Sequence, residues 1–282
     1  MTLRSSKKIL RPLVGNLIRR SPLRWHIPNK VTRMGVIQRA IDILGAQKYL
    51  EIGVSSGINF CTVTAPEKIG VDPISPSPAV LMETSKSGVC YFAHTSDDFF
   101  EQVAPQLLTG GVDVVFIDGL HTYEQAYRDC LNSLRYLNSG GLILLHDCLP
   151  TSELEARVAD NFEDATKLNT GMARNYNWVG DVWKAILRLR TEHMHLMTCV
   201  LHCDHGIGLV YRAQNECGLS LTMAQIDAMT YADLASDAKR LLGLRKPSHL
   251  MAVLGKLRLE PRRVVWKPEL NSAHAHRRET KT

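Results

Sequence analysis

Short apolar runs alternate with segments of helical periodicity from residue 49 to residue 145, and this alternation constrains the fold more than any other feature of the sequence. Strands that alternate with helices are typical of βαβ units, in which helices cover both faces of a parallel sheet. Two further apolar runs follow at 195–201 and 206–211, and a connection of about four residues forces two strands to pair antiparallel. The sequence therefore predicts an α/β fold: a seven-stranded, mostly parallel sheet with an antiparallel last strand and helices on both faces.

Each element is placed by the residues that begin and end it. Thr32 is a typical helix N-cap and Gly45 a typical helix end, so the apolar positions between them predict a helix. Further helices are expected from about residue 58, in a short stretch after 78, and over 97–108, 123–137, 181–190 and 219–243. The strands are expected over 49–52, 69–71, 89–94, 112–117, 142–145, 195–201 and 206–211.

Charge divides the chain into three parts. Residues 1–33 carry nine lysines and arginines and no acidic residue, residues 239–282 carry twelve against three, and the middle is acidic. We expect a basic N-terminal arm over 1–33, a globular domain over 34–212, C-terminal helices over 213–244 and a basic, flexible tail over 245–282. The basic ends are either arms that attract phosphate, lipid head groups or an acidic partner, or they are solvated tails.

Composition excludes several classes of protein. With 45% apolar and 22% charged residues, the chain is neither disordered nor collagen-like. No apolar run reaches the roughly 18 residues of a membrane-spanning helix, and residues 1–25 lack a secretory signal. The seven cysteines are scattered and odd in number, which is typical of reduced thiols in the cytoplasm. Cys199, Cys203 and His205 lack the further ligand that a zinc site needs.

Polar residues stand where the predicted parallel strands end, and ligands of an open parallel sheet bind beyond these carboxyl ends. The residues at these ends are Glu51, Gly53, Gly57, Asp72, Ser96, Asp97, Asp118, His146 and Asp147. Most of the ends are acidic, which excludes the glycine- and lysine-rich loops that hold phosphate groups.

The turn from Gly53 to Gly57 lets the backbone approach a ligand closely, and the carboxylate of Asp72 is able to bind both hydroxyls of a ribose. A nicotinamide dinucleotide and S-adenosylmethionine both fit that description. A dinucleotide fold requires a glycine where this chain has Ser55. Glu51 would repel a pyrophosphate and suits the ammonium group of a methionine tail. The pattern therefore favours S-adenosylmethionine as the cofactor.

At this point the chain, from about residue 47 to residue 212, resembles the class I S-adenosylmethionine-dependent methyltransferases, and within them the small-molecule group called methyltransferase family 24. The motifs that carry the resemblance are YLEIGVSSG at 49–57, FIDGLHTYE at 116–124, Asp129, the glycine pair at 140–141 and LHD at 145–147. The resemblance implies a Rossmann-like fold and an enzyme that methylates a hydroxyl of a small molecule, such as a sugar or a phenol.

The resemblance also implies roles for the strand-end residues. The turn with Gly53 and Gly57 would line the methionine moiety, and Asp72 would hold the ribose. Ser96 and Asp97 would flank the adenine. Asp118 would lie beneath the reactive sulfonium.

Related catechol- and sugar-directed O-methyltransferases bind magnesium through acidic residues after the fourth and fifth strands, and the matching positions here are Asp118, His146 and Asp147. The relatives usually show further acids or an asparagine where this chain has His146 and Cys148. A Mg²⁺ ion there would bind two substrate oxygens and lower the pKa of one hydroxyl.

His121 follows Asp118 by three residues and is the candidate general base, because an imidazole takes up a proton near neutral pH. It equally fits a residue that caps the following helix or braces Asp118. His146 is a second base, a metal ligand or a hydrogen-bonded strand-end residue, and Asp118 completes the candidate catalytic set. Asp129 is expected to be structural.

Residues 149–180 lack strong periodicity and are predicted to form a lid over the site. The aromatic residues Trp178 and Trp183 either form a wall for the substrate or pack in the core. The expected partner is a small molecule. Contact of the basic N-terminal segment with a membrane surface is a minor hypothesis, and the regions of Trp25 and Trp266 either dock on the body or form a homodimer contact.

Two other functions stay open. A nucleic-acid methyltransferase would use the basic ends as phosphate clamps, but such enzymes carry an Asn/Asp-Pro-Pro-Tyr-like loop where this chain has Asp118-Gly-Leu-His. A binding module on the same fold would hold the cofactor without turnover.

Overall fold

The computed structural model describes residues 31–167, 177–215, 217–261 and 263. Most of the expected N-terminal arm and the end of the expected tail lie outside the described residues, as do Trp25 and Trp266. The described residues belong to the unit Val31–Thr282. None of the helices described in this unit is long and apolar enough to cross a bilayer.

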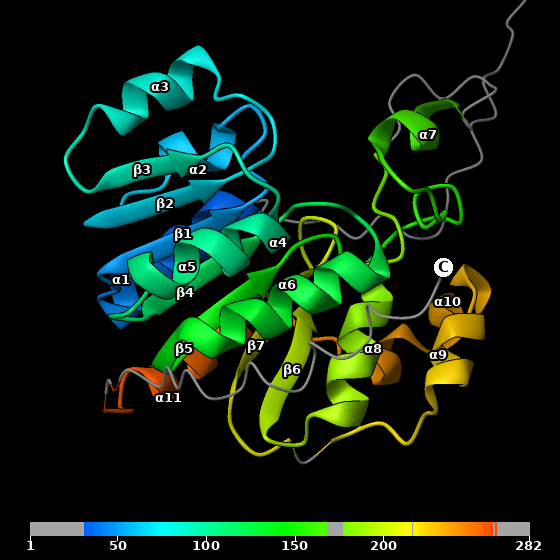
Figure 1. The fold of residues 1–282 in the computed structure, drawn as a ribbon. Helices are drawn as coiled ribbons and strands as arrows, with labels where there is room; N and C mark the ends of the chain where they lie inside the picture. The colour runs from blue at the N-terminus through cyan, green and yellow to red at the C-terminus, as the bar shows by residue number, and fades with distance from the viewer. Residues whose placement is uncertain (1–30, 168–176, 216, 262, 264–282) are drawn as a thin grey trace, which may run out of the picture. The chain divides into compact units, whose positions relative to one another are not determined.

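Within the described part of the chain, seven strands form one sheet in the order β3-β2-β1-β4-β5-β7-β6 (Figure 1). The strands are β1 (Lys48–Ile52), β2 (Glu67–Val71), β3 (Val89–Phe92), β4 (Val112–Ile117), β5 (Leu137–Leu145), β6 (Leu196–Leu201) and β7 (Ile207–Arg212). Strands β1 to β5 run parallel, whereas β7 is antiparallel to both of its neighbours. This topology confirms the predicted, mostly parallel sheet with an antiparallel last strand.

The helices follow the predicted order, with one interruption. They are α1 (Arg33–Leu44), α2 (Ile58–Thr62), α3 (Pro78–Thr84), α4 (Ser96–Asp98), η1 (Phe99–Val103), α5 (Ala104–Leu107), α6 (Tyr123–Tyr136), α7 (Phe162–Lys167), α8 (Trp183–Glu192), α9 (Met223–Ala228), α10 (Tyr231–Leu241) and α11 (His249–Leu257). The helix predicted over 97–108 contains the π-helical turn η1, where the amide of Ala104 donates to the carbonyl of Phe99. Pro105 follows and has no amide hydrogen with which to continue an α-helical pattern.

Side chains alternate between the two faces of the sheet, and both faces are covered by helices. On one face, Leu50 and Ile117 pack in a core with residues of α6 and α8. On the other face, Tyr49 and Phe116 pack with residues of α1, α2 and α11. Trp183 of α8 is buried in the first core, so core packing is its role.

Helix α11 corrects the prediction that residues 245–282 form a flexible tail. Its side chains Leu250, Val253, Leu254 and Leu257 are buried in the same core as α1. These residues recur at i, i+3, i+4 and i+7, which is the spacing of one apolar helix face. The prediction of a tail followed from the basic charge of the segment instead of from this spacing. Helices α9 and α10 lie within the region where C-terminal helices are predicted.

Candidate active site

Strands β4 and β5 end side by side. Their last residues, Ile117 and Leu145, pair in the parallel register. The hydrogen bonding of the sheet continues one residue further, because the amide of Asp118 donates to Ile52 (2.8 Å) and the amide of His146 donates to Ile117 (2.9 Å). The sheet thus fixes the backbone where both functional loops begin, at the edge where ligands are expected.

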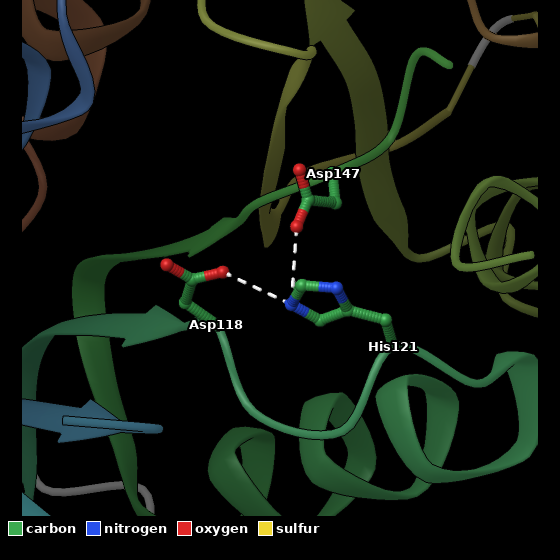
Figure 2. A group of neighbouring side chains, drawn as sticks. All are labelled: Asp118, His121 and Asp147. Atoms are coloured by element: carbon green, nitrogen blue, oxygen red, sulfur yellow. Dashed lines mark ion pairs between the residues drawn. The ribbon is translucent and has the colours of Figure 1, made fainter. Parts of the chain in front are cut away.

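Three side chains from these loops point toward one another (Figure 2). Asp118, His121 and Asp147 each offer one ligand atom, and these atoms all lie within 4.8 Å of one another. Nε2 of His121 is 3.1 Å from Oδ2 of Asp147 and 3.5 Å from Oδ1 of Asp118. Two carboxylates and one imidazole nitrogen at this spacing are a suitable donor set for a divalent cation. We call these three residues the ligand cluster.

The second ring nitrogen of His121 sets the orientation of the ring. Nδ1 lies 2.7 Å from the carbonyl oxygen of Trp178, and because a carbonyl only accepts, Nδ1 carries the hydrogen. Nε2 therefore turns a lone pair toward Asp118 and Asp147 unless a cation, either a proton or a metal ion, stands between them. Burial disfavours the charged ring, but hydrogen bonding to Asp118 and the charge of Asp147 outweigh it and raise the pKa of His121.

Residues 177–182, at the end of the expected lid, pack against His121. Gly180 has a φ of +67°, and a Cβ at this position would lie 1.8 Å from the carbonyl oxygen of His121. The position therefore requires glycine. The ring of Trp178 lies 5.3 Å from the imidazole, centroid to centroid. Asp181 accepts a hydrogen bond of 2.7 Å from the amide of Tyr123 and so anchors the segment to the start of α6.

Asp147 adopts an unusual backbone conformation. Its φ is +59°, in the left-handed region that a residue with a Cβ adopts at a cost. The next two amides hold this conformation, because Cys148 donates to Gly206 (3.1 Å) and Leu149 donates to His205 (2.7 Å). The connection between β6 and β7 therefore directs the carboxylate of Asp147 toward the cluster.

His146 contacts the carboxylates of both Asp118 and Asp147. Its Nδ1 lies 3.1 Å from Oδ1 of Asp118 and 3.1 Å from Oδ1 of Asp147, and its side chain is buried. Carboxylates only accept, so Nδ1 is the donor. Burial disfavours the charged ring, but the charges of Asp118 and Asp147 outweigh it and raise the pKa of His146 to about 10. Burial likewise opposes the charge of Asp118, yet His146 and His121 lower the pKa of that carboxyl.

The glycine turn after β1 packs directly against this site. Gly53 has a φ of +85°, and a Cβ there would lie 2.0 Å from the carbonyl oxygen of Asp118. The carboxylate of Asp72 holds the turn, since it accepts hydrogen bonds from the amides of Ser55 (2.8 Å) and Ile74 (2.9 Å). At Gly57, φ is +89° and a Cβ would meet the side chain of α3 residue Val80. Both glycines are thus required by close packing.

Comparison with known families agrees with this geometry. Residues 50–148, which contain the glycine turn and the ligand cluster, match the model of a family described as a methyltransferase domain. Residues 50–148 are thus similar to a methyltransferase domain, and we call them the matched segment. The seven-stranded sheet, parallel except for its last strand, is the class I fold that the motifs predict. A search of curated proteins found no match to the chain.

Solved structures with a similar fold include three methyltransferases. An O-methyltransferase from Bacillus cereus in complex with SAH is 14% identical over 65% of this chain and 83% of that chain, with a TM-score of 0.47. An SAH-bound methyltransferase from Podospora anserina is 13% identical over 64% and 78%, with a TM-score of 0.46. An O-methyltransferase from Streptomyces achromogenes in complex with SAM is 10% identical over 63% and 78%, with a TM-score of 0.43. At this level of sequence identity, the substrates of these proteins say nothing about the substrate of this chain.

The residues predicted to flank the adenine form a network with helix α6 of the matched segment. Gln125 donates to Ser96 (3.0 Å) and to Asp129 (2.9 Å), and Arg128 pairs with Asp97 at 2.9 Å. Burial raises the pKa of Asp129 to about 7. This network connects α4 to α6 beside the turn that carries the ligand cluster, and contact of its residues with adenine stays a prediction.

Glu51 lies fully buried in the matched segment. The hydroxyl of Tyr49 donates to its Oε2 at 2.7 Å. Burial raises the pKa of Glu51 to about 8, so the carboxyl is mainly neutral at physiological pH. Its contact with the ammonium group of the cofactor stays a prediction.

Sequence reasoning missed Arg33 and Asp204. Arg33 is the first residue of α1 rather than the end of a separate arm, which corrects the predicted boundary. Its Nη1 lies 3.3 Å from the ring nitrogens of His146 and 3.5 Å from Oδ2 of Asp118. Its backbone amide donates to Asp204 at 2.6 Å. The N-cap at Thr32 is the one signal in the sequence that assigns Arg33 to the globular body.

Proposed function

We propose that this chain transfers the methyl group of S-adenosylmethionine to a hydroxyl oxygen of a small molecule, with Asp118, His121 and Asp147 holding a divalent cation at the point of transfer. One observation carries the proposal: Nδ1 of His121 donates to Trp178 while Nε2 faces two carboxylates. Metal-binding histidines characteristically donate their second ring N–H to a carbonyl or carboxylate, which aims the other nitrogen at the metal. Mg²⁺ and Mn²⁺ suit the oxygen-rich donor set.

A cation held there supplies positive charge that lowers the pKa of a substrate hydroxyl. The residues of the chain supply position. The site has two halves: the ligand cluster and the glycine turn at 53–57, which we call the cofactor turn because the cofactor is expected there. Asp118 belongs to both halves, because its carboxylate is part of the ligand cluster and its carbonyl packs against Gly53 of the cofactor turn. Methyl transfer is a single in-line displacement: the hydroxyl oxygen gives up its proton to solvent and bonds to the methyl carbon, while the bond between that carbon and sulfur breaks and S-adenosylhomocysteine leaves. Its rate therefore depends on holding the hydroxyl in line with the methyl group.

We assign His146 a positioning role instead of that of a ligand or a base. Its Nδ1 donates to one oxygen of each carboxylate and thereby holds Asp118 and Asp147 in their orientation toward the cluster. The side chain is only 2% exposed, which leaves it no open path to a substrate. Without a metal, Nε2 of His121 would take the hydroxyl proton as a general base.

The cytoplasm is the compartment that fits the chain, because all seven cysteines are free thiols. The nucleic-acid alternative, the membrane contact and the homodimer depend on basic or aromatic residues that lie mostly outside the described residues. They stay predictions.

Calorimetric titrations with S-adenosylhomocysteine and with Mn²⁺, together with transfer of methyl groups to catechol, test the proposal. We expect the wild type to bind both ligands and to lose transfer when EDTA removes the metal. Asp147→Asn should bind Mn²⁺ about 10–100-fold more weakly while it still binds S-adenosylhomocysteine. Asp42→Asn changes an exposed carboxylate of α1 and should behave as the wild type.

Three results would contradict parts of the proposal. Failure to bind S-adenosylhomocysteine at millimolar concentration would overturn methyl transfer itself. Transfer that is insensitive to EDTA would overturn the role of the cation and leave His121 as the base. Cofactor binding without transfer to any of a panel of phenols, sugars and hydroxy acids would favour the binding module.

A further inference from the structure

The side chain of Arg33 contacts the ligand cluster on one side and the helix after the cofactor turn on the other. The proposed function gives it no role in either place. Its Nη1 lies 3.5 Å from Oδ2 of Asp118, whereas His121 and His146 approach the other oxygen, Oδ1. On its other side, Nε donates to Oδ1 of the buried Asn59 at 3.2 Å. Asn59 belongs to α2, the helix that follows the cofactor turn. The guanidinium therefore contacts both Asp118 of the ligand cluster and the helix that follows the glycine turn.

Three separate elements fix Arg33 in this place. It begins α1, whose N-cap Thr32 accepts a hydrogen bond from Gly35. Its amide donates to Asp204 in the connection between β6 and β7, and its Nη1 lies 3.3 Å from both ring nitrogens of His146. The first two of these contacts fix the backbone of Arg33, while Asn59 and Asp118 hold its side chain, so the side chain loses little further freedom when it binds a ligand, which favours affinity.

Part of the same guanidinium makes no contact with the site. One third of the side chain is exposed, and Nη2 makes no hydrogen bond to any residue that the structure describes. The two terminal nitrogens of an arginine form a planar fork that matches the two oxygens of a carboxylate. Among the described residues, Arg33 thus combines donors that contact the site with one terminal nitrogen that has no hydrogen-bond partner.

The charges around Arg33 also favour an anion. Its nearest carboxylate, Asp118, belongs to the ligand cluster, and a divalent cation held there would take up the charge of that carboxylate. Asp204 accepts the backbone amide of Arg33, with Oδ2 at 2.6 Å, rather than its guanidinium. With the cation in place, the positive charge of Arg33 has no dedicated counter-ion among these neighbours. An anionic group of the substrate would supply one.

We propose, on the basis of the proposed function, that Arg33 determines substrate specificity: it selects compounds that carry a carboxylate on the same ring or short chain as the methylated hydroxyl over the corresponding neutral compounds. A matched pair of probes tests this. Catechol and 3,4-dihydroxybenzoate share the vicinal hydroxyls and differ by one carboxylate. Calorimetry measures the binding of each to the full chain with S-adenosylhomocysteine and saturating Mg²⁺, and initial rates with S-adenosylmethionine give the same comparison in turnover.

The wild type should bind 3,4-dihydroxybenzoate at least about tenfold more tightly than catechol, the ratio expected for one charge-assisted pair. Arg33→Gln should bring this ratio close to one. Arg33→Lys should keep part of it, because lysine retains the charge and loses the fork. Arg39→Gln removes an exposed arginine of the same helix and should keep the full ratio.

Equal affinities of the wild type for the two probes, or no binding of either, would overturn the inference. An unchanged ratio in Arg33→Gln would overturn it as well. If Arg33→Gln instead weakens S-adenosylhomocysteine binding about tenfold or more, the guanidinium holds the carboxylate of the cofactor and the inference fails. These outcomes leave methyl transfer standing as long as the wild type binds S-adenosylhomocysteine and methylates one compound of the panel, so the two failures are distinguishable.

Discussion

Replacement of Gly180 by alanine should disrupt the ligand cluster, although Gly180 is not part of it, because the new methyl group would clash with the backbone of His121. The new Cβ would lie 1.8 Å from the carbonyl oxygen of His121, so either the 177–182 segment or His121 must move. Alanine pays roughly 1–2 kcal/mol for the left-handed φ, and loss of the hydrogen bond between His121 and Trp178 costs about 1 kcal/mol. We therefore expect the free energy of unfolding to fall by about 2–3 kcal/mol.

The same substitution should weaken metal binding, because a histidine ligand that loses its second hydrogen bond typically costs the site about 10–100-fold in affinity. Thermal unfolding and titration with Mn²⁺ measure the two effects. Gly110→Ala is the control, since Gly110 has no positive φ and no atom lies within 4 Å of its Cβ position. If Gly180→Ala keeps both the wild-type Tm and the wild-type affinity, the carbonyl of Trp178 does not position His121.

Three further predictions concern the fold around the site. The pKa of Glu51 is raised to about 8 in the folded chain, so its contribution to the free energy of unfolding is complete below its ordinary pKa and is lost as the pH rises through 8. Glu51→Gln should therefore be more stable than the wild type in urea unfolding at pH 9. Equal profiles of stability against pH for the two proteins would refute this. Lys68→Met should lower the free energy of unfolding in urea by about 2–3 kcal/mol, because the buried Lys68 ammonium donates to Glu83 and to two backbone carbonyls while Glu83 stays paired with Lys86. A loss below about 1 kcal/mol, the range of an exposed pair, would show that the buried pair is not needed. Leu254→Ala should lower the free energy of unfolding by about 2–4 kcal/mol, because Leu254 of α11 is fully buried, whereas Met251→Ala, at an exposed position of the same helix, should lower it little. Equal, small losses for the two variants would show that α11 does not stabilise the globular body.

The sheet and the strand-end residues were predictable because each depends on local pattern. Alternation of apolar runs and helices determines a parallel sheet, and the carboxyl ends of its strands lie at one edge. Asp118 and Asp147 follow two strands in this way, so their proximity in the ligand cluster follows from the topology. Asp72 accepts hydrogen bonds from backbone amides of the turn, and its contact with ribose stays a prediction.

Contacts between distant segments were not predictable. Trp178 follows His121 by 57 residues, and no periodicity marks its carbonyl as the acceptor that orients the imidazole. Arg33 and His146 are 113 residues apart, and the charge of the preceding segment assigned Arg33 to an arm. Charge also concealed α11, whose apolar spacing lies in a strongly basic region. Pattern thus predicts elements and their ends, whereas side-chain partners depend on packing.

Anomalous diffraction from crystals grown with Mn²⁺ and S-adenosylhomocysteine is the most direct test of the cation site. We predict one strong peak within about 2.0–2.3 Å of a carboxylate oxygen of Asp118, a carboxylate oxygen of Asp147 and Nε2 of His121. Density that shows Nε2 turned away from both carboxylates, or a peak absent from this position at saturating Mn²⁺, would contradict the account.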